Sequence, residues 1–111
     1  MNLSIGTDIL YIPRLKKTIE TNPNFINKVY TKKELEIANN LSNSLEFYAT
    51  RFAAKEAIIK ATNGEYDFSE IEILKEKNGK PLPSIINNKN INIELSLSYD
   101  NDYAIAFCII K

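Results

Sequence analysis

The chain has 111 residues, with 14 basic and 14 acidic side chains, one cysteine and no histidine. The absence of histidine excludes a Ser-His or Cys-His nucleophile pair, and one cysteine without histidine cannot form a structural zinc site. A metal ion in this protein must therefore be a hard cation bound by carboxylates.

The first half of the sequence predicts one strand followed by helices. Residues 2–10 alternate between apolar and polar side chains, which is typical of a half-buried strand. A short helix is predicted over 14–20, where proline and asparagine residues flank the segment. Thr31 and Glu34 have the spacing of a capping box, which predicts that a helix begins near residue 32 and ends near residue 41.

Basic side chains gather in the segment 14–33, although the net charge of the chain is zero. This segment contains six basic residues and a single acidic one, Glu20. The excess favours a basic surface for an anionic partner, and a solvated helix surface explains it equally well. A nucleic-acid-binding domain is the least favoured explanation, because few aromatic side chains lie among the basic ones.

A third helix, predicted over 44–62, carries an acid at the edge of its apolar stripe. The stripe consists of Leu45, Tyr48, Ala49, Phe52, Ala53 and Ile59. Glu56 lies at its edge, where a charge is costly unless it is paired or bound to a metal. An ion pair with Lys60 one turn later is one explanation. The other is a divalent cation shared with Asp8, near the end of the first strand on its less apolar face, although Asp8 also suits a local turn or helix cap.

The second half of the chain predicts strands. A strand over 71–77 ends at an Asn-Gly turn at 78–79, and the alternating segments 91–97 and 103–109 should pair as an antiparallel hairpin. Helices in the first half and strands in the second predict an α+β fold, in one domain over residues 1–111.

Neither the N-terminus nor any later segment predicts targeting to a membrane. No apolar run approaches the roughly 18–20 residues that cross a bilayer. The N-terminus lacks the basic region and apolar core of a signal peptide. Cys108 has no partner for an internal disulfide, which suits a reducing compartment. We therefore expect a cytoplasmic protein.

Three basic side chains of the predicted helix 44–62 suit a substrate with several phosphates. Arg51 and Lys55 lie one turn apart, and Lys60 lies one turn after Glu56. Arginine forks and lysine ammonium groups are both common phosphate ligands. An ordinary charged helix surface is the alternative.

Several motifs match one family in order along the chain. They are IGTDI (5–9), YTKKELE (30–36), EFYATRFAAKEA (46–57), IEI (71–73), NGKP (78–81), LSLS (95–98) and DYAIA (102–106). On these motifs the chain closely resembles the holo-acyl-carrier-protein synthases, which are small bacterial 4′-phosphopantetheinyl transferases.

The resemblance implies a fold and a reaction. The fold is the α+β 4′-phosphopantetheinyl transferase fold, a small antiparallel sheet packed with helices, in a homotrimer with active sites between subunits. The reaction moves the phosphopantetheine arm of coenzyme A to a serine of apo-acyl carrier protein and releases adenosine 3′,5′-bisphosphate.

The resemblance also assigns catalytic roles to four residues. Asp8 and Glu56 would hold Mg²⁺, or Mn²⁺ in its place, against the pyrophosphate of coenzyme A. Glu36 would activate the serine through water. Lys60 would stabilise or protonate the leaving group.

Two sets of binding residues follow from the resemblance. The coenzyme A-binding residues are Arg51, Lys55, Lys60, Gly64, Lys80, Pro81, Ser98 and Tyr99. Among them, Arg51 would contact the 3′-phosphate, and the turn Gly79-Lys80-Pro81 would line the adenine site. Arg14 and Lys17 would bind the carrier protein, and we expect neither nucleic acid nor a membrane as partner.

The chain departs from the family at three places. Tyr99 stands where the family has a histidine, the loop 62–67 keeps one of several glycines, and Thr50 replaces a glycine. Tyrosine brings no positive charge to the 3′-phosphate. A protein of the same fold that binds coenzyme A and carrier protein without transferring the arm is therefore the alternative function.

Overall fold

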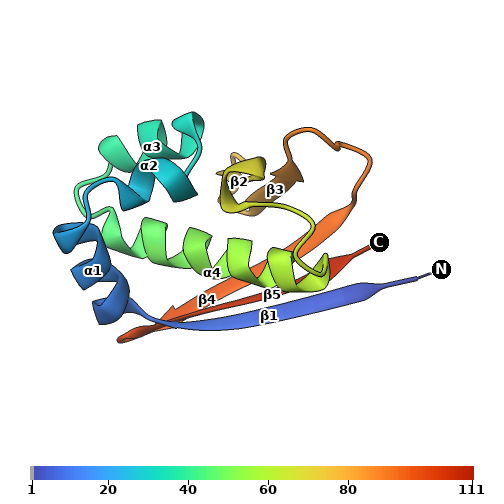
Figure 1. Cartoon of the computed structure of the whole chain (residues 1–111), viewed down its shortest axis with the longest axis horizontal. Helices are drawn as coiled ribbons and strands as arrows, with labels where there is room; N and C mark the ends of the chain where they lie inside the picture. Colours follow the sequence, from blue (N-terminus) through green and yellow to red (C-terminus); the bar gives the residue numbers. More distant parts are fainter. Residues whose placement is uncertain (1) are drawn as a thin grey trace.

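The computed structural model describes residues 2–111, and its centre is a long helix, α4 (Leu45–Ala61), that lies on one face of a three-stranded sheet (Figure 1). The sheet consists of β1 (Ser4–Tyr11), β4 (Ile93–Asp100) and β5 (Tyr103–Ile110). Their order is β1-β5-β4, and both pairings are antiparallel. The predicted hairpin of the last two strands is thereby confirmed.

Segments 25–39 and 68–85 lie on the other side of α4, and segment 12–21 lies beside the N-terminal end of α4 (Figure 1). The chain passes from β1 through α1 (Ile12–Thr21), α2 (Phe25–Val29) and α3 (Lys32–Asn39). After α4 come a short 3₁₀ helix, η1 (Phe68–Glu70), and a two-stranded antiparallel sheet of β2 (Ile71–Lys75) and β3 (Pro81–Ile85). This arrangement confirms the α+β class and encloses α4 between two layers.

Strand β1 is buried on the face opposite to its large apolar side chains. Gly6 is buried, whereas Ile5 is 67% and Ile9 is 65% exposed. A Cβ atom on Gly6 would lie 1.9 Å from the carbonyl oxygen of Ala57, so glycine is needed for β1 to approach α4 this closely. The predicted alternation is correct, but the less apolar face points inward.

Strand β5 repeats this pattern. Its inward side chains are small and buried, and they are Ala104, Ala106 and Cys108. Its outward side chains are large and partly exposed, and they are Tyr103, Ile105 and Phe107. Strands β1 and β5 therefore pack α4 through small residues and present large apolar side chains on the outer side of the sheet.

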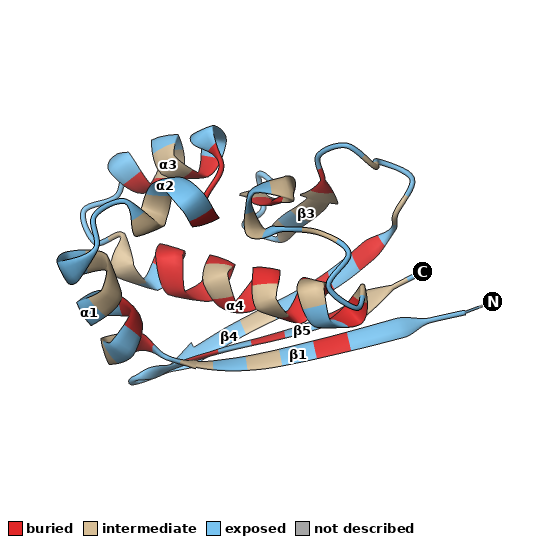
Figure 2. Ribbon diagram, in the orientation of Figure 1, coloured by how far each residue is buried: buried red, intermediate tan, exposed pale blue. Residues whose placement is uncertain are grey.

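Helix α4 is buried nearly all round, as Figure 2 shows by its colouring. Ala49, Ala53 and Ala57 are fully buried, while Phe52, Glu56 and Ile59 are half-buried. The predicted stripe therefore includes the least buried edge of the helix. The surrounding layers bury the opposite side, because α4 has neighbours both below and above it.

Three elements were not predicted, namely α2, η1 and β3. Proline disfavours a strand, and β3 contains both Pro81 and Pro83. It pairs with β2 alone, so it is an edge strand, where a missing N–H group is tolerated. The capping box of Thr31 and Glu34 at the start of α3 is confirmed.

No helix of the described residues is long and apolar enough to span a bilayer.

Candidate active site

The site begins where β1 crosses α4, because these two elements bring Asp8 and Glu56 together. The Asp8 side chain is 14% exposed, and Glu56 is half-buried. Burial raises the pKa of Glu56, the negative charge of Asp8 raises it further, and the charge of Lys60 opposes both. The two carboxylates are thus close enough to repel each other, which is the arrangement a shared cation would relieve.

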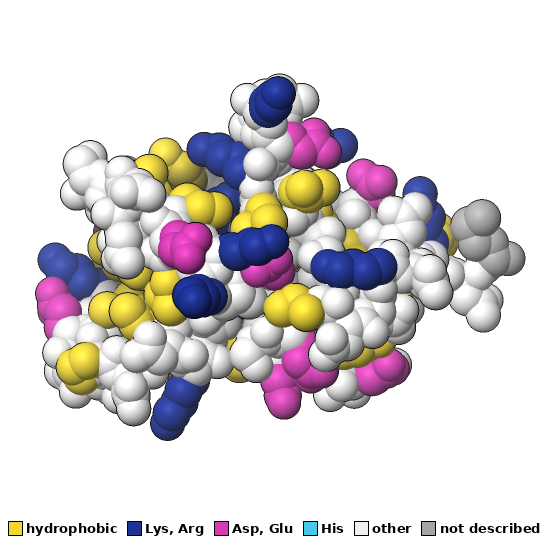
Figure 3. Space-filling view, turned by 90° about the horizontal axis from the view of Figure 1, so that it is seen from above, with side chains coloured by type: hydrophobic (Ala, Val, Ile, Leu, Met, Phe, Trp, Pro, Cys, Tyr) yellow, Lys and Arg dark blue, Asp and Glu magenta, His cyan; other side chains and the backbone are white. Residues whose placement is uncertain are grey.

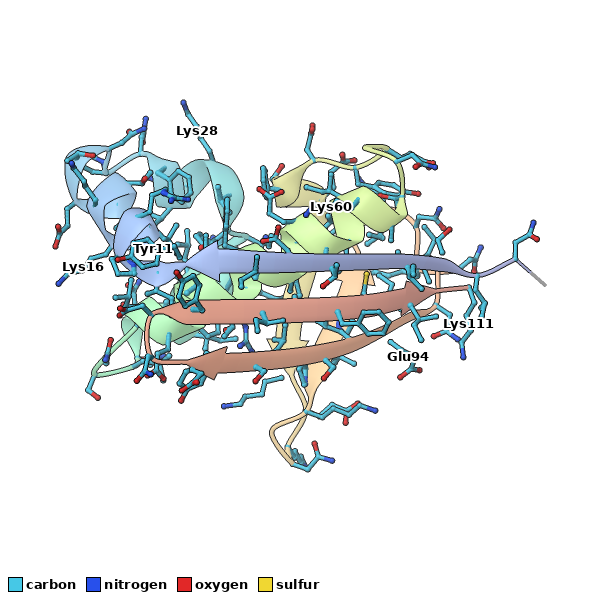
Figure 4. The ribbon with its side chains drawn as sticks, turned by 90° about the horizontal axis from the view of Figure 1, so that it is seen from below. Tyr11, Lys16, Lys28, Lys60, Glu94 and Lys111 are labelled. Atoms are coloured by element: carbon cyan, nitrogen blue, oxygen red, sulfur yellow. The ribbon has the colours of Figure 1, made fainter. Side chains whose placement is uncertain are left out.

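Lys60 lies beside β1 (Figure 4) and contacts it through two hydrogen bonds. Its Nζ donates to Oδ1 of Asp8 and to the carbonyl oxygen of Thr7, each at 3.0 Å. The ion pair of Lys60 is therefore formed across to the strand, with Asp8 rather than with Glu56. Asp8 does not cap the following helix either. The N-cap residue of α1 is Tyr11, and no side-chain capping hydrogen bond is formed there.

A pocket of about 410 Å³ lies on the other side of α4, between its N-terminal half and strands β3 and β4. Arg51, Pro81, Ser98 and Tyr99, all predicted to bind coenzyme A, line it. Glu46 and Lys75 line it too and were not predicted, although Glu46 is the first residue of the longest family motif.

Arg51 gives this pocket an unsatisfied donor. The residue is 8% exposed, and its Nε has no hydrogen-bond partner among the described residues. Its guanidinium lies 4.4 Å from the ring centre of Phe47, and Nη1 donates to Oγ1 of Thr50 at 3.2 Å. Burial lowers the pKa of Arg51, and the charge of Glu34 opposes that shift. An anion in the pocket would satisfy the free donor.

Tyr99 adds a phenol to the pocket, and Glu46 adds a carboxylate, so neither side chain brings positive charge. Glu46, which lines the same pocket, raises the pKa of the phenol. The tyrosine therefore stays neutral.

Lys55 does not line the pocket, and its assignment to coenzyme A is corrected by the structure. The side chain is fully buried, and its Nζ pairs with Glu34 at 2.7 Å. Burial lowers the pKa of Lys55, while Glu34 opposes this by its charge and its hydrogen bond. No donor of Lys55 is left for a substrate, because Val29 and Phe68 accept its other two hydrogen bonds.

The other predicted residues are exposed and lie outside the pocket, and they are Arg14, Lys17, Glu36, Gly64 and Lys80. On the face seen in Figure 3, basic side chains are mixed with acidic ones instead of forming one patch.

The acid pair and the pocket lie toward opposite edges of the sheet. Asp8 on β1 pairs with Ala106 on β5, and Ala106 pairs with Leu97 on β4, next to Ser98. Two strand spacings place the backbones of Asp8 and Leu97 about 10 Å apart.

Comparison with known proteins identifies the family. The sequence model of the 4′-phosphopantetheinyl transferase superfamily matches residues 4–108. The chain belongs to this superfamily. It is thus an enzyme of the phosphopantetheinyl transferase class.

Individual members of the superfamily are similar over nearly the whole chain. The holo-[acyl-carrier-protein] synthase of Clostridium botulinum (strain Alaska E43 / Type E3) is 40% identical, over 96% of this chain and 95% of the relative. The crystal structure of a holo-(acyl-carrier-protein) synthase from Bacillus anthracis str. Ames, in complex with CoA (3′,5′-ADP), has a TM-score of 0.85 at 32% identity and covers 96% of this chain and 94% of that one. The coenzyme A complex of the Chronobacterium ammoniagenes enzyme has a TM-score of 0.86 at 26% identity, with 100% and 98% covered. The predicted family and fold are confirmed.

Proposed function

We propose that this protein is a holo-acyl-carrier-protein synthase that transfers the 4′-phosphopantetheine arm of coenzyme A to a serine of apo-acyl carrier protein. Adenosine 3′,5′-bisphosphate is the second product, and fatty acid biosynthesis in the cytoplasm is the setting. The observation that carries the proposal is the meeting of Asp8, Glu56 and Lys60 at the crossing of β1 and α4.

Asp8 and Glu56 fit a magnesium ion. The described residues contain no group of three His, Cys, Asp or Glu side chains able to hold a metal, so the protein would supply two carboxylates. Mg²⁺ is commonly held by one or two carboxylates together with substrate phosphates and water. When bound, Mg²⁺ or Mn²⁺ supplies positive charge to the diphosphate.

Lys60 has the position and freedom to act on the leaving phosphate. Its ammonium group already lies at the Asp8 carboxylate, and its side chain is 56% exposed. An ammonium beside the bridging oxygen stabilises the negative charge that develops there. Glu36, exposed on α3, would take the proton of the incoming serine through water.

The pocket suits the nucleotide end of coenzyme A. The free Nε of Arg51 would donate to the 3′-phosphate, and the segment of Lys80 and Pro81 would contact the adenine. Ser98 would add a hydroxyl donor. Tyr99, a phenol whose pKa is raised by Glu46, gives this phosphate less charge than a histidine would.

A trimer would complete the site. The outer face of the sheet leaves Tyr103 47%, Ile105 42% and Phe107 42% exposed, and apolar patches of this kind usually mark an interface. One coenzyme A would then span the acid pair of one subunit and the pocket of its neighbour, which lie at opposite edges within a chain.

Carrier protein would dock at α1. Arg14 and Lys17 are exposed there, and Arg14 lies over the ring of Tyr11. Opposite charges would mainly speed the encounter and set its register.

The transfer itself can be followed by intact mass. Purified protein is incubated with coenzyme A, Mg²⁺ and apo-acyl carrier protein. We expect each carrier molecule to gain one phosphopantetheine, and none to do so when EDTA is present. No gain with Mg²⁺ or Mn²⁺, from protein that still binds coenzyme A, would instead establish the alternative of a binding protein without transfer.

A further inference from the structure

A fully buried ion pair joins helix α4 to helix α3. Nζ of Lys55 on α4 and Oε1 of Glu34 on α3 are 2.7 Å apart, and neither side chain has any exposed surface. Removing two charges from water is unfavourable, and their attraction repays this only when the remaining donors and acceptors are also bonded. The surroundings of this pair meet that condition.

Lys55 uses all three of its hydrogens. Besides Glu34, its Nζ donates to the carbonyl oxygen of Val29 at 2.7 Å and to that of Phe68 at 3.0 Å. The ring of Tyr30, 5.5 Å from Nζ, covers the ammonium group. One side chain of α4 is thereby attached to the end of α2 and to η1.

Both carboxylate oxygens of Glu34 accept hydrogen bonds as well. Its Oε1 also accepts from the backbone N–H of Thr31 at 2.8 Å, and its Oε2 accepts from that of Ile73 at 2.7 Å. The Thr31 hydroxyl in turn donates to Glu72 at 2.6 Å. The pair therefore joins α3 to β2 as well, so that five segments meet at one ion pair.

The pair lies next to the proposed catalytic groups in sequence. Lys55 directly precedes Glu56 on α4, and Glu34 lies two residues before Glu36 on α3. Successive helical residues are separated by about 100°, so fixing Lys55 fixes the rotation of α4 and the direction in which Glu56 points. On the opposite side, the contact of Gly6 with Ala57 fixes the distance from α4 to β1.

We propose that Lys55 and Glu34 are positioning residues, which hold α4 and α3 so that Glu56 faces Asp8 and Glu36 keeps its place. The proposal rests on the proposed function. The pair touches no substrate, since it is buried. An apolar pair of the same shape would stabilise the fold equally well or better, but it would lack the directional bonds that fix rotation. Transfer of a phosphoryl group is sensitive to displacements of about 1 Å, whereas binding in a broad pocket is more tolerant.

The test compares Lys55→Met, Glu34→Gln and the double variant. Each single change leaves one buried charge or polar group unpaired, so its melting temperature should fall strongly. The double variant removes both charges, keeps similar side-chain volumes and leaves a glutamine for the capping box. Its melting temperature should lie above that of either single variant and below that of wild type, because the carbonyl groups of Val29 and Phe68 still lose their donor. Ile85→Val, a core change on β3 that removes no hydrogen bond of the pair, is the control for lowered stability alone.

The kinetic readout separates positioning from stability. At a temperature where each variant is folded, kcat of the double variant should be at least about tenfold below wild type, with KM for coenzyme A within about threefold. Ile85→Val should keep the wild-type kcat. A double variant with wild-type kcat would overturn the proposal, and so would one that stays unfolded, because the pair would then serve folding alone.

A metal-binding readout distinguishes this proposal from the proposed function. If wild type transfers nothing, the proposed function fails, and the positioning role is judged from Mn²⁺ binding measured by electron paramagnetic resonance. The double variant should bind Mn²⁺ about tenfold more weakly than wild type, since Glu56 would be misdirected. Equal affinities would contradict positioning.

Discussion

Glu56 combines a structural disadvantage with a proposed role as metal ligand. Its carboxylate is half-buried beside Asp8, and its raised pKa shows that the folded protein disfavours the charge. Such strain at a single residue is common where a site awaits a cation or a substrate. The residue therefore offers a test in which stability and activity change in opposite directions.

Glu56→Gln should stabilise the metal-free protein at neutral pH and abolish transfer. Because the pKa of Glu56 is raised above its ordinary 4.5, the folded state holds this proton more tightly than the unfolded chain. The favourable contribution is present below pH 4.5 and is lost as the pH rises through the folded-state pKa. The variant should therefore melt a few degrees above wild type at pH 7 in EDTA, and the difference should shrink as the pH falls toward 4.5. A difference independent of pH would contradict this assignment.

Two substitutions of Lys60 test whether transfer needs its charge and its side-chain length. Lys60→Ala should lower kcat by about 100-fold, since it removes the ammonium from the developing charge. Lys60→Arg should recover part of that loss. Lys89→Ala, which removes an exposed lysine bonded only to Ser84, is the matched control and should keep the wild-type kcat. Steady-state kinetics at saturating Mg²⁺ give the comparison, and an unimpaired Lys60→Ala would remove Lys60 from the mechanism.

The residues of the site differ in how far sequence alone could place them. Glu56 stood out because it lies at the edge of an apolar stripe, and Asp8 was the second acid expected at the end of the first strand. In the structure the charge of Asp8 acts on Glu56 and raises its pKa. Lys55 has the same charge and the same helix as Arg51, so spacing gave no sign that it is buried. Its partner Glu34 is 21 residues away, and only the folded arrangement shows the pair.

At the scale of elements, the close approach of β1 to α4 positions the acid pair. Gly6 permits this approach, because any side chain there would meet the backbone of Ala57. Alanine on α4 and on β5 keeps the layers close. The geometry of the proposed site therefore depends on small residues as much as on charged ones.

Gly6→Ala should separate β1 from α4. The added Cβ would lie 1.9 Å from a carbonyl oxygen, so the strand must move, at a cost of about 1–3 kcal/mol or more. Gly79→Ala is the matched control: it meets no atom within 4 Å, and only its positive φ of 90° disfavours alanine, by about 1–2 kcal/mol. Urea denaturation gives the free energies of unfolding. If Gly6→Ala lowers the free energy of unfolding less than Gly79→Ala does, the contact of Gly6 with Ala57 does not limit how closely β1 approaches α4.

Element prediction succeeded where the pattern was local. The capping box of α3 and the alternation of β4 and β5 depend on neighbouring residues, and both were correct. The inward face of β1 was not evident from the alternation, because α4 admits only glycine there. Burial all round α4 likewise arises from two layers that are distant in sequence, which a helical wheel does not represent.

At the scale of the whole molecule, the outer face of the sheet predicts self-association. Its apolar side chains come from β1 and β5, and no described element covers them. An assembly would also bring the β1 edge of one chain to the pocket of another.

Ile105→Asp should give a monomer that has lost transfer activity. Ile105 lies at the centre of the exposed face, and a buried, unpaired carboxylate there would oppose assembly. Leu82→Asp is the matched control, since Leu82 is 45% exposed on β3, outside that face. Light scattering should report a trimer for wild type and Leu82→Asp, and a monomer for Ile105→Asp. A monomeric wild type at micromolar concentration would contradict the trimer.

The most direct measurement is the binding of Mn²⁺ in the presence of coenzyme A, followed by electron paramagnetic resonance in wild type, Asp8→Asn and Glu56→Gln. If both carboxylates hold one ion against the diphosphate, wild type binds one Mn²⁺ per chain and each substitution weakens that binding by at least about tenfold. Undiminished binding in either variant would show that the two acids do not share a metal, and the proposed site would be wrong.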